Sequence, residues 1–372
     1  MKVAVIGGFA QSLLNFRGSM IKAMVAKGHR VVAMAPDDQP SVRPALAAIG
    51  AEFEPAPLNR TGLNPLHDLW ALRSLTTSLR RHRVDAVLCY TAKAVVYGLM
   101  AARIAGIPLR CAMITGAGSV LQTPRTFRQL LVNRSLRALY GVALRGAHLV
   151  FFQNQDDETL FRRLRLIGAR QRLCRIDGSG VDLDQFAFTP SPEGPPTFLL
   201  VGRLLRDKGI FEYVEAARIV RQSRPDARFR LLGMYDNNPS AIQASQVQGW
   251  VDEGVIDYQG TVEDVRPQIA AAHVCVLPSY NEGLPRSILE GMSMGRPIIT
   301  TDAPGCRETV VPGVNGFLAP VKDPSALAKA MLRALQGPPS LAVMGAASRA
   351  LAERRFDVHL VNRAILGAMN LL

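Results

Sequence analysis

The fold is indicated most clearly by residues 274–294, which read VCVLPSYNEGLPRSILEGMSM. The stretch begins with a short apolar run, passes through a polar loop, and continues into an amphipathic segment from residue 285 onward. Pro285 suits the first position of a helix, where a missing N–H costs nothing. The pattern therefore predicts a strand, a loop and a helix in that order, which is the building unit of a parallel sheet.

The same alternation recurs along the rest of the chain. In the first half it predicts strands at 3–6, 29–35, 86–90, 109–114 and 149–153, and helices at 18–27, 66–83 and 95–105. In the second half it predicts strands at 197–201, 228–232, 255–259, 274–278 and 297–300, and helices at 210–222, 265–272, 285–294, 325–335 and 341–372. Repeated units of this kind predict an α/β protein with parallel sheets.

A proline-rich stretch at 188–196 separates the two halves, because proline at this density continues neither a strand nor a helix. We expect a first domain at 1–187, a linker at 188–196 and a second domain at 197–354, both doubly wound. A helix at about 355–372 is expected to pack back on the first domain. Ligands of such sheets bind outside the carboxyl ends of the strands, so the site is expected in a cleft between the domains.

Charge is divided unequally between the two halves. The chain of 372 residues has a formal charge of +14, to which residues 1–185 contribute +13 and residues 186–372 contribute +1. No Asp or Glu occurs between Asp85 and Asp156, a stretch with eight Lys or Arg residues. The first half is expected to meet something anionic, either a membrane surface or nucleic acid. The alternative is the evenly solvated surface of an arginine-rich protein.

Composition narrows the class of protein. Hydrophobic residues make up 48% and charged residues 20%, which is typical of a globular chain with a large core. No apolar run reaches the roughly 20 residues of a membrane-spanning helix, and the N-terminus lacks a signal-peptide pattern. The five cysteines form no CxxC pair, and the six histidines show no metal-ligand spacing. A reduced, cytoplasmic protein without a bound metal or other cofactor is expected.

A first candidate binding loop reads VGRLLRDKG at residues 201–209 and lies between a predicted strand and a predicted helix. Gly202 allows a sharp turn and the close approach of a ligand, and Gly233 ends the neighbouring strand. Arg203 and Lys208 place two cations beside a helix N-terminus, where backbone N–H groups are also available. Such a loop suits a diphosphate. The alternative is a pair of solvated charges.

A second candidate loop, residues 278–291, contains two glutamates. Glu282 precedes the helix and is placed to contact a sugar or a reacting hydroxyl. Glu290 lies inside the helix and can accept hydrogen bonds from a ribose diol. The helix N-terminus at this edge again favours phosphate. A helix cap or a surface charge is the alternative for either glutamate alone.

These motifs together resemble glycosyltransferase family 4, a group of retaining enzymes with the GT-B fold. Glu282 and Glu290 match its E-x7-E motif, and the loop at 202–209 is similar to its donor-phosphate loop. Two further segments, GVDLDQF at 180–186 and NGFL at 315–318, are similar to family segments. The resemblance covers the whole chain, although each motif alone is weak. A narrower similarity, carried by residues 7–17 and 115–118, points to bacterial enzymes that extend polyprenyl-diphosphate-linked sugars for capsule, O-antigen or exopolysaccharide.

The resemblance implies a nucleotide-sugar donor, with UDP as the family's usual nucleotide and a hexose or N-acetylhexosamine as the sugar. Arg203 and Lys208 would hold the diphosphate, Glu290 the ribose, and Glu282 would face the sugar, so that Glu282, Arg203 and Lys208 are the catalytic candidates. The implied donor-binding residues also include Gly7, Gly8, Gly202, Gly233, Gly283 and Leu284. A metal-independent, front-face retaining reaction is implied. The Asp182-Leu183-Asp184 sequence is therefore interpreted as a coincidence rather than a metal motif.

Candidates for the acceptor side come from the first half of the chain. Thr115 and Gly116 stand where many relatives carry a histidine, and Lys93 is a candidate contact for an acceptor phosphate or simply a surface lysine. Residues 132–145 follow the pattern of an amphipathic helix, which either packs on the sheet or faces a bilayer. The acceptor and membrane candidates are Lys93, Thr115, Arg125, Arg128, Arg134 and Arg137.

The sequence is compatible with three functions. The first is sugar transfer from a UDP-sugar to a lipid-linked saccharide by a cytoplasmic enzyme on the anionic inner face of the cytoplasmic membrane. The second is a GT-B nucleotide-sugar 2-epimerase or a transferase with a soluble acceptor; an epimerase would not need the basic first half. The third is a non-catalytic nucleic-acid-binding protein, which is disfavoured because the acid-free stretch has few aromatic residues and no nucleic-acid motif. NAD binding is disfavoured because Gly7 and Gly8 lack the third glycine of the dinucleotide fingerprint.

Overall fold

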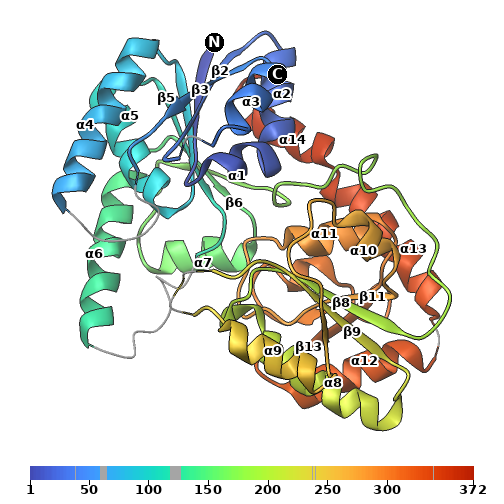
Figure 1. Cartoon of the computed structure of the whole chain (residues 1–372). Helices are drawn as coiled ribbons and strands as arrows, with labels where there is room; N and C mark the ends of the chain where they lie inside the picture. The colour runs from blue at the N-terminus through green and yellow to red at the C-terminus, as the bar shows by residue number, and fades with distance from the viewer. Residues whose placement is uncertain (38, 59–64, 118–126, 237, 239, 338) are drawn as a thin grey trace. The chain divides into compact units, whose positions relative to one another are not determined.

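The chain forms two compact units in the computed structural model (Figure 1), which describes residues 1–37, 39–58, 65–117, 127–236, 238, 240–337 and 339–372. The first unit comprises Met1–Ser179 with Leu360–Leu372, and the second comprises Gly180–His359. The C-terminal segment belongs to the first unit because Val361, Ile365 and Leu366 are buried in its core.

The first unit is built on a seven-stranded parallel sheet in the order β3-β2-β1-β4-β5-β6-β7. Successive residues of a strand point to opposite faces, so that Val3 and Val5 join one buried cluster while Ala4 and Ile6 join another. Because both faces are covered, the strands are apolar along nearly their whole length. The strands are β1 Lys2–Ile6, β2 Arg30–Ala35, β3 Ala51–Pro55, β4 Ala86–Tyr90, β5 Leu109–Ile114, β6 Leu149–Phe152 and β7 Arg172–Arg175.

Helices cover both faces of this sheet (Figure 1). One face carries α4 Pro65–His82, the π-helical turn η1 Ala94–Gly98, α5 Leu99–Ala105, α6 Phe127–Leu144 and α7 Gln155–Arg163. The other face carries α1 Ala10–Asn15, α2 Gly18–Ala26, α3 Val42–Ala48 and α14 Val358–Ala368. The prediction did not include β3, β7, α1, α3 or α7.

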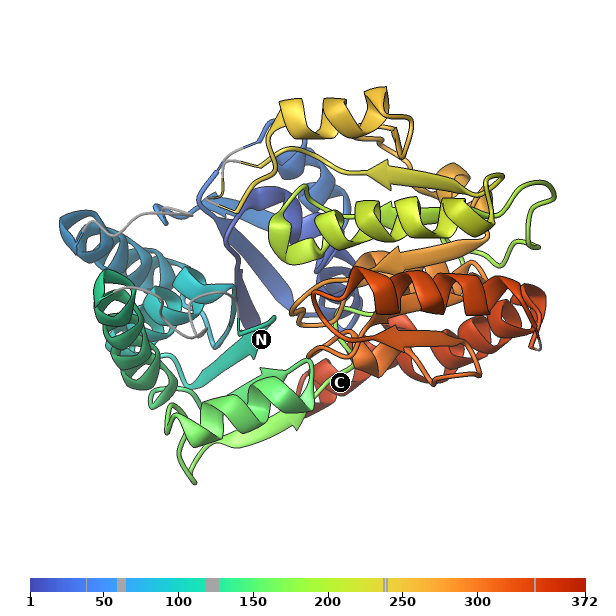
Figure 2. The same cartoon turned by 90° about the horizontal axis from the view of Figure 1, so that it is seen from below.

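The second unit contains a six-stranded parallel sheet in the order β10-β9-β8-β11-β12-β13. Its strands are β8 Thr197–Val201, β9 Arg228–Leu232, β10 Asp257–Tyr258, β11 Val274–Leu277, β12 Ile298–Thr301 and β13 Gly316–Ala319. Its helices are α8 Ile210–Ser223, α9 Ala244–Asp252, α10 Arg266–Ala270, α11 Arg286–Ser293, α12 Pro324–Leu335 and α13 Leu341–Leu351, with the short turns η3 Arg206–Lys208, η4 Arg307–Thr309 and η5 Ala352–Phe356. Helices α8 and α12 lie side by side (Figure 2).

The region 341–372, predicted to be helical, is helical at 341–356 and again at 358–368, and the chain leaves the first helical segment at Asp357. There the backbone pairs with Val181, which donates to the carbonyl of Phe356 at 2.7 Å and accepts from the N–H of Val358 at 3.0 Å. The Asp357 side chain then accepts the N–H of His359 at 2.8 Å, at the start of α14. The interruption lets the last helix leave the second unit and join the first.

The proline-rich stretch packs against the second unit instead of spanning freely. Arg296 is fully buried, and its Nη2 donates to the carbonyls of Thr189 and Pro190, both at 2.9 Å. The N–H of Thr189 donates to the carbonyl of Met294 at 3.3 Å. Burial lowers the pKa of Arg296. These contacts place residues 188–196 within the second unit, so that the division between units falls earlier, at Ser179–Gly180.

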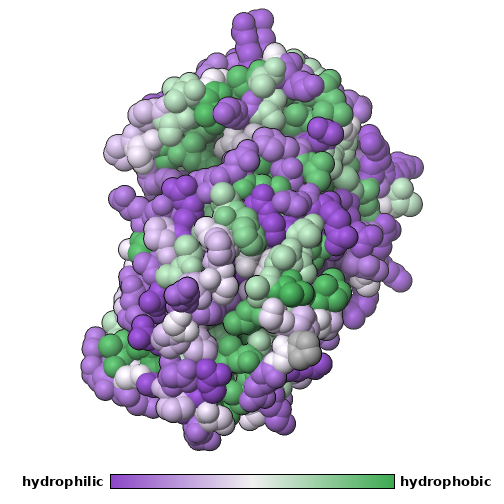
Figure 3. All heavy atoms as spheres, turned by 90° about the vertical axis from the view of Figure 1, so that its right-hand side faces the viewer, coloured by the Kyte–Doolittle hydropathy of each residue, from purple (hydrophilic) through white to green (hydrophobic). Residues whose placement is uncertain are grey.

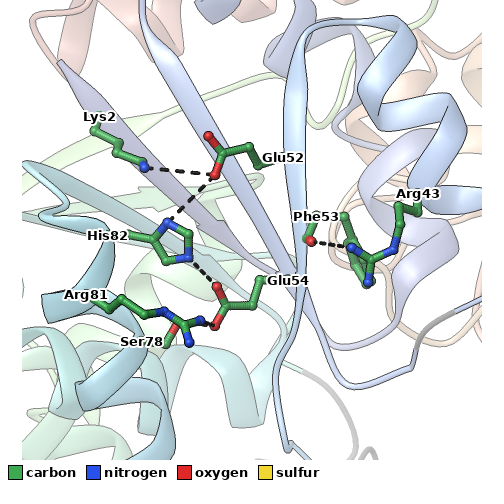
Figure 4. Close-up of polar contacts among 8 residues, drawn as sticks. All are labelled: Lys2, Arg43, Glu52, Phe53, Glu54, Ser78, Arg81 and His82. Atoms are coloured by element: carbon green, nitrogen blue, oxygen red, sulfur yellow. Dashed lines mark hydrogen bonds and ion pairs between the residues drawn. The ribbon is translucent and has the colours of Figure 1, made fainter.

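The edge strand β3 is tied to α4 through Glu54 (Figure 4). The Glu54 carboxylate accepts from Arg81 Nη2 at 2.6 Å and also from the Ser78 hydroxyl and His82 Nε2. His82 Nδ1 lies 3.7 Å from Glu52. Burial acts to raise the pKa of Glu54, but the hydrogen bonds from Ser78, His82 and Arg81 outweigh it and the pKa lies below its ordinary value. The orientation of α4 is thereby fixed against the sheet.

We expect Glu54→Gln to lower the free energy of unfolding by about 1–3 kcal/mol at neutral pH, because a neutral amide replaces a charged acceptor. The pKa of Glu54 is lower in the folded state, so its contribution is present above the unfolded-state pKa and is lost as the pH falls through the folded-state pKa. Denaturant unfolding of both proteins from neutral to acidic pH measures the difference. Glu52→Gln, at a side chain that is 60% exposed, is the matched control. A difference that does not shrink in acid would contradict this account.

Within the described ranges, no helix is long and apolar enough to cross a membrane. On the face drawn in Figure 3, hydrophobic residues are interspersed with hydrophilic ones.

Candidate active site

The candidate site lies in the second unit, where the loops after β8, β9 and β11 leave the same edge of the sheet. The strand order reverses between β8 and β11, and ligands of open parallel sheets bind outside the carboxyl ends of the strands at such a point. Gly202, Arg203 and Lys208 follow β8, and Gly233 follows β9. The loop with the two glutamates follows β11, so the predicted donor residues of the second domain share one edge.

Lys208 and Glu282 form an ion pair between two of these loops. Lys208 Nζ donates to Glu282 Oε1, and the side chains are only 20% and 13% exposed. The loops are locked together by the carbonyl of Asp207, which accepts from the N–H of Tyr280 at 2.9 Å and the hydroxyl of Ser279 at 3.0 Å. The loops at 201–209 and 278–291 are far apart in the sequence, but they meet in one partly buried polar site.

Two glycines allow the backbones to come this close. Gly209 has φ +72°, and a Cβ there would lie 2.0 Å from the carbonyl oxygen of Pro278. Gly305, with φ +75°, lies against the carbonyls of Glu282 and Gly283, where a Cβ would be 2.4 Å from each oxygen. The loop after β12 thus supports Glu282, a role that the sequence prediction missed.

Arg203 is held by a different carboxylate. Its Nη1 donates to Asp236 Oδ2 at 2.7 Å, and the guanidinium side chain is 43% exposed. Asp236 was not predicted, although its place just after β9 and Gly233 was the available signal. Gly233 has φ +153°, and a Cβ there would lie 1.7 Å from the carbonyl oxygen of Gly202. The glycine pair brings the ends of β8 and β9 together beneath Arg203.

Glu290 lies one turn inside α11, with its side chain 12% exposed. Arg286, four residues earlier, donates from Nε to Glu290 Oε1 at 2.8 Å. Burial raises the pKa of Glu290, and Arg286 opposes that rise. The prediction missed Arg286, although an arginine and a glutamate four residues apart on a helix are the usual signal of an ion pair. Of the predicted residues between the glutamates, Gly283 is buried and Leu284 packs on the hydrophobic core.

The first sheet also has a switch point, meaning a place where the strand order reverses, and it lies between β1 and β4. Gly7 and Gly8 follow β1, and a Cβ would lie 2.3 Å from the Tyr90 hydroxyl oxygen at Gly7 and 2.6 Å from Thr91 Oγ1 at Gly8. Thr91 has φ +70°, which is strained for a β-branched residue, and strain of this kind gathers at functional sites. Its Oγ1 is buried without a hydrogen-bond partner among the residues described. Nothing in the sequence signals this conformation.

The acceptor-side candidates are placed separately. Lys93 is paired with the buried Asp68 at 3.1 Å, and Asp68 also accepts from the Tyr97 hydroxyl at 2.7 Å. Thr115 is half-buried just after β5, while on α6 Arg134 is exposed and Arg137 is half-buried. Arg125 and the side chain of Arg128 lie outside the residues that the structure describes.

The apolar face of residues 132–145 packs inside the first unit. Tyr140 and Ala143 are buried, and Leu136 and Leu139 pack against the same cluster beneath the sheet. The sheet is apolar on both faces and needs this cover. Of the two interpretations of this helix, the bilayer-facing one is therefore wrong for this face.

Asp182 stabilises a turn. Its Oδ1 accepts the N–H groups of Asp184 at 3.1 Å and Gln185 at 2.9 Å, as aspartates in such turns often do. No group of three or more His, Cys, Asp or Glu residues within the described part of the chain is arranged to hold a metal ion.

Two doubly wound parallel sheets, with cations and carboxylates gathered at the carboxyl edge of the second, match the architecture of the GT-B class of glycosyltransferases. Family models support this: "Glycosyl transferase 4-like domain" matches residues 16–177, and "Glycosyl transferases group 1" matches residues 195–337. The chain belongs to glycosyltransferase family 4. The predicted fold class and the prediction of an enzyme are confirmed.

Named relatives are similar over most of the chain. One is the N,N'-diacetylbacillosaminyl-diphospho-undecaprenol alpha-1,3-N-acetylgalactosaminyltransferase of Campylobacter jejuni, 27% identical over 87% of this chain and 86% of its own. Another is the UDP-Gal:alpha-D-GlcNAc-diphosphoundecaprenol alpha-1,3-galactosyltransferase of Escherichia coli, 25% identical over 72% of this chain and 70% of its own. Among solved structures, Anabaena HepE in complex with UDP-glucose aligns over the whole of both chains with a TM-score of 0.78 and 20% identity, a likeness of fold.

Proposed function

We propose that this chain transfers a hexose or N-acetylhexosamine from a UDP-sugar to a saccharide linked to a polyprenyl diphosphate, on the cytoplasmic face of a bacterial membrane. The observation that carries the proposal is the Lys208–Glu282 pair at the switch point between β8 and β11. The acceptor class is supported by two relatives whose names specify diphospho-undecaprenol acceptors. The nucleotide is supported by the name of the second relative and by HepE with UDP-glucose.

The donor's diphosphate is assigned to Lys208 and Arg203. As the bond from sugar C1 to the diphosphate breaks, negative charge grows on the leaving group, and fixed cations stabilise that charge. Lys208 is already ordered against Glu282, so it needs little rearrangement when the diphosphate arrives. The N-terminus of α11 at the same edge adds a favourable dipole.

The carboxylates are assigned to hydroxyl groups of the donor. Glu290, held by Arg286, accepts hydrogen bonds from the ribose diol. Glu282, on the loop before α11, faces the donor sugar and lies close to the developing positive charge at C1. Because the Glu282 carboxylate also contacts Lys208, it fixes the position of the sugar relative to the cation that binds the diphosphate.

The reaction proposed is a front-face transfer with retention of configuration. The bond from C1 to the diphosphate oxygen breaks, and a bond from C1 to the acceptor oxygen forms on the same face. The acceptor's proton passes to the leaving diphosphate, so no protein base is required at that step.

The test is direct. The purified chain is screened against nucleotide-sugars by thermal shift, and transfer is then measured to a polyprenyl-diphosphate-linked monosaccharide, with the product's anomeric configuration read by NMR. Transfer with retention supports the proposal. Epimerisation of the nucleotide-sugar, or transfer only to soluble sugars, would replace it with the alternative of an epimerase or a soluble-acceptor enzyme.

We expect transfer to persist in EDTA, because Lys208 and Arg203 supply the positive charge that the leaving diphosphate requires. Initial rates are measured with and without the chelator after exhaustive dialysis. Restoration of a lost activity by Mg²⁺ or Mn²⁺ would show that a metal, and not these two side chains alone, neutralises the diphosphate.

A further inference from the structure

The outward face of α4 combines exposed apolar side chains with arginines. Leu66, Leu69 and Trp70, in the first turns of the helix, are 81%, 64% and 57% exposed. Further along the same face come the exposed arginines Arg73, three residues after Trp70, and Arg80 and Arg81, about two helical turns later. We call these six residues the α4 face.

The only acidic residue of α4, Asp68, lies on the opposite side of the helix, buried and paired with Lys93. The inward face is a normal helix–sheet contact, in which Leu75 and Leu79 are buried. The apolar residues of the α4 face lie on the side of the helix away from this contact. Three large apolar side chains gathered beside cations mark an interaction surface more strongly than scattered ones do.

The helix presents this face rigidly. Glu54 on β3 is hydrogen-bonded to Ser78, Arg81 and His82, as the close-up shows (Figure 4). Between β3 and α4 lies an open groove of about 330 Å³, lined by Trp70, Arg73, Ser74, Thr77, Arg81 and Glu54 among others. The arginines and hydroxyl groups that line this groove can bind a phosphate group, and the indole of Trp70 at its side can contact apolar parts of the same ligand.

We infer that the α4 face docks on the surface of an anionic phospholipid bilayer. The apolar first turns enter the boundary between headgroups and acyl chains, Trp70 sits at the interface, and Arg73, Arg80 and Arg81 meet lipid phosphates. Charge complementarity selects this partner: residues 1–185 carry a net +13, and α4 has no acid on its outward side. The inference deepens the proposed function, since a lipid-linked acceptor lies in such a bilayer, and it moves the contact from α6 to α4.

Tryptophan fluorescence tests the contact without any substrate. The chain has two tryptophans, and Trp250 packs against Phe211 in the second unit, so Trp250→Phe leaves Trp70 as the reporter. With vesicles of phosphatidylethanolamine and phosphatidylglycerol, we expect the emission of Trp70 to shift to the blue and to be quenched by lipids brominated on their acyl chains. Vesicles of phosphatidylcholine alone should give a much smaller shift, and salt should reduce the effect. Vesicle flotation with an unchanged Trp70 emission would overturn the inference.

Matched variants separate the local surface from net charge. Arg73→Ser/Arg80→Ser, which leaves the Arg81–Glu54 contact intact, is expected to weaken partitioning onto the anionic vesicles by roughly 10- to 30-fold. Arg163→Ser/Arg170→Ser removes the same charge from exposed positions of the same unit and should have a small effect. Leu69→Ser/Trp70→Ser should also weaken partitioning, whereas Val343→Ser, at a side chain 58% exposed in the second unit, should not. Equal losses in a variant and its control would overturn the inference.

The proposed function and the α4 contact fail in different ways. The Leu69→Ser/Trp70→Ser variant should transfer sugar normally to a water-soluble, short-chain acceptor and lose rate only with acceptor embedded in vesicles. If no acceptor is used while Trp70 still inserts, the proposed function falls and the contact stands. If the variant retains full rate on embedded acceptor, the contact falls. If the wild-type chain sediments as a dimer and this variant sediments as a monomer, the α4 face is an interface between copies. That result would likewise overturn the inference.

Discussion

Lys208→Ala is expected to lower kcat/KM for sugar transfer by about 10²- to 10³-fold, the usual loss when one preorganised donor to a developing negative charge is removed. Lys208 is the cation that the structure holds directly against Glu282, with its side chain only 20% exposed. Its charge therefore acts on the site with less screening by water than a surface lysine. Most of the loss should appear in kcat, because the charge on the diphosphate grows only as the bond to C1 breaks.

Arg206→Ala is the matched control for this variant. Arg206 begins the same short turn and carries the same charge, but its guanidinium lies over the ring of Phe211, 4.7 Å from the centroid. We expect it to retain activity within a few-fold, and both variants should keep the wild-type circular dichroism. Normal turnover of folded Lys208→Ala would remove Lys208 from the site, and equal losses in the two variants would show that the effect comes from overall charge.

The sequence predicted the architecture well where strands are buried on both sides. The runs of β4 and β11 are buried along their whole length, and that of β1 is apolar after Lys2, so the nature and order of these strands could be inferred from the alternation alone. The edge strand β3 was missed because Glu52 and Glu54 interrupt its apolar pattern, and Glu54 turns out to serve α4. The break at Asp357 depends on a pairing with Val181, which no local pattern reveals.

The central residues of the candidate site were predictable, whereas most of their partners were not. Lys208 and Glu282 were singled out by their place at strand ends and by the family motifs, and parallel topology explains why they meet. The i,i+4 pair of Arg286 and Glu290 had a local signal that was missed, whereas the contact of Arg203 with Asp236 and the strained backbone of Thr91 arise only in the folded chain. An amphipathic pattern is the same whether a helix faces a sheet or a bilayer, so only packing could decide the orientation of α6.

Gly209→Ala is expected to be among the most damaging single-methyl changes in the second unit. A Cβ at Gly209 would lie 2.0 Å from the carbonyl oxygen of Pro278, so the loop after β11 must move away from η3. We expect the free energy of unfolding to fall by about 3–5 kcal/mol. The activity that remains should fall by about 10²-fold, because the motion separates Lys208 from Glu282.

The control isolates the backbone conformation from the clash. Gly254 has the same φ of +72°, but a Cβ there would meet nothing within 4 Å. Gly254→Ala therefore carries only the cost of a left-handed alanine, about 1–2 kcal/mol, and should leave transfer unchanged. Denaturant unfolding and initial rates are measured for both variants. If Gly209→Ala is no worse than Gly254→Ala, the close approach of the two loops does not position the site. The larger loss in Gly209→Ala would show that the geometry of Lys208 and Glu282 depends on a backbone contact that only glycine permits.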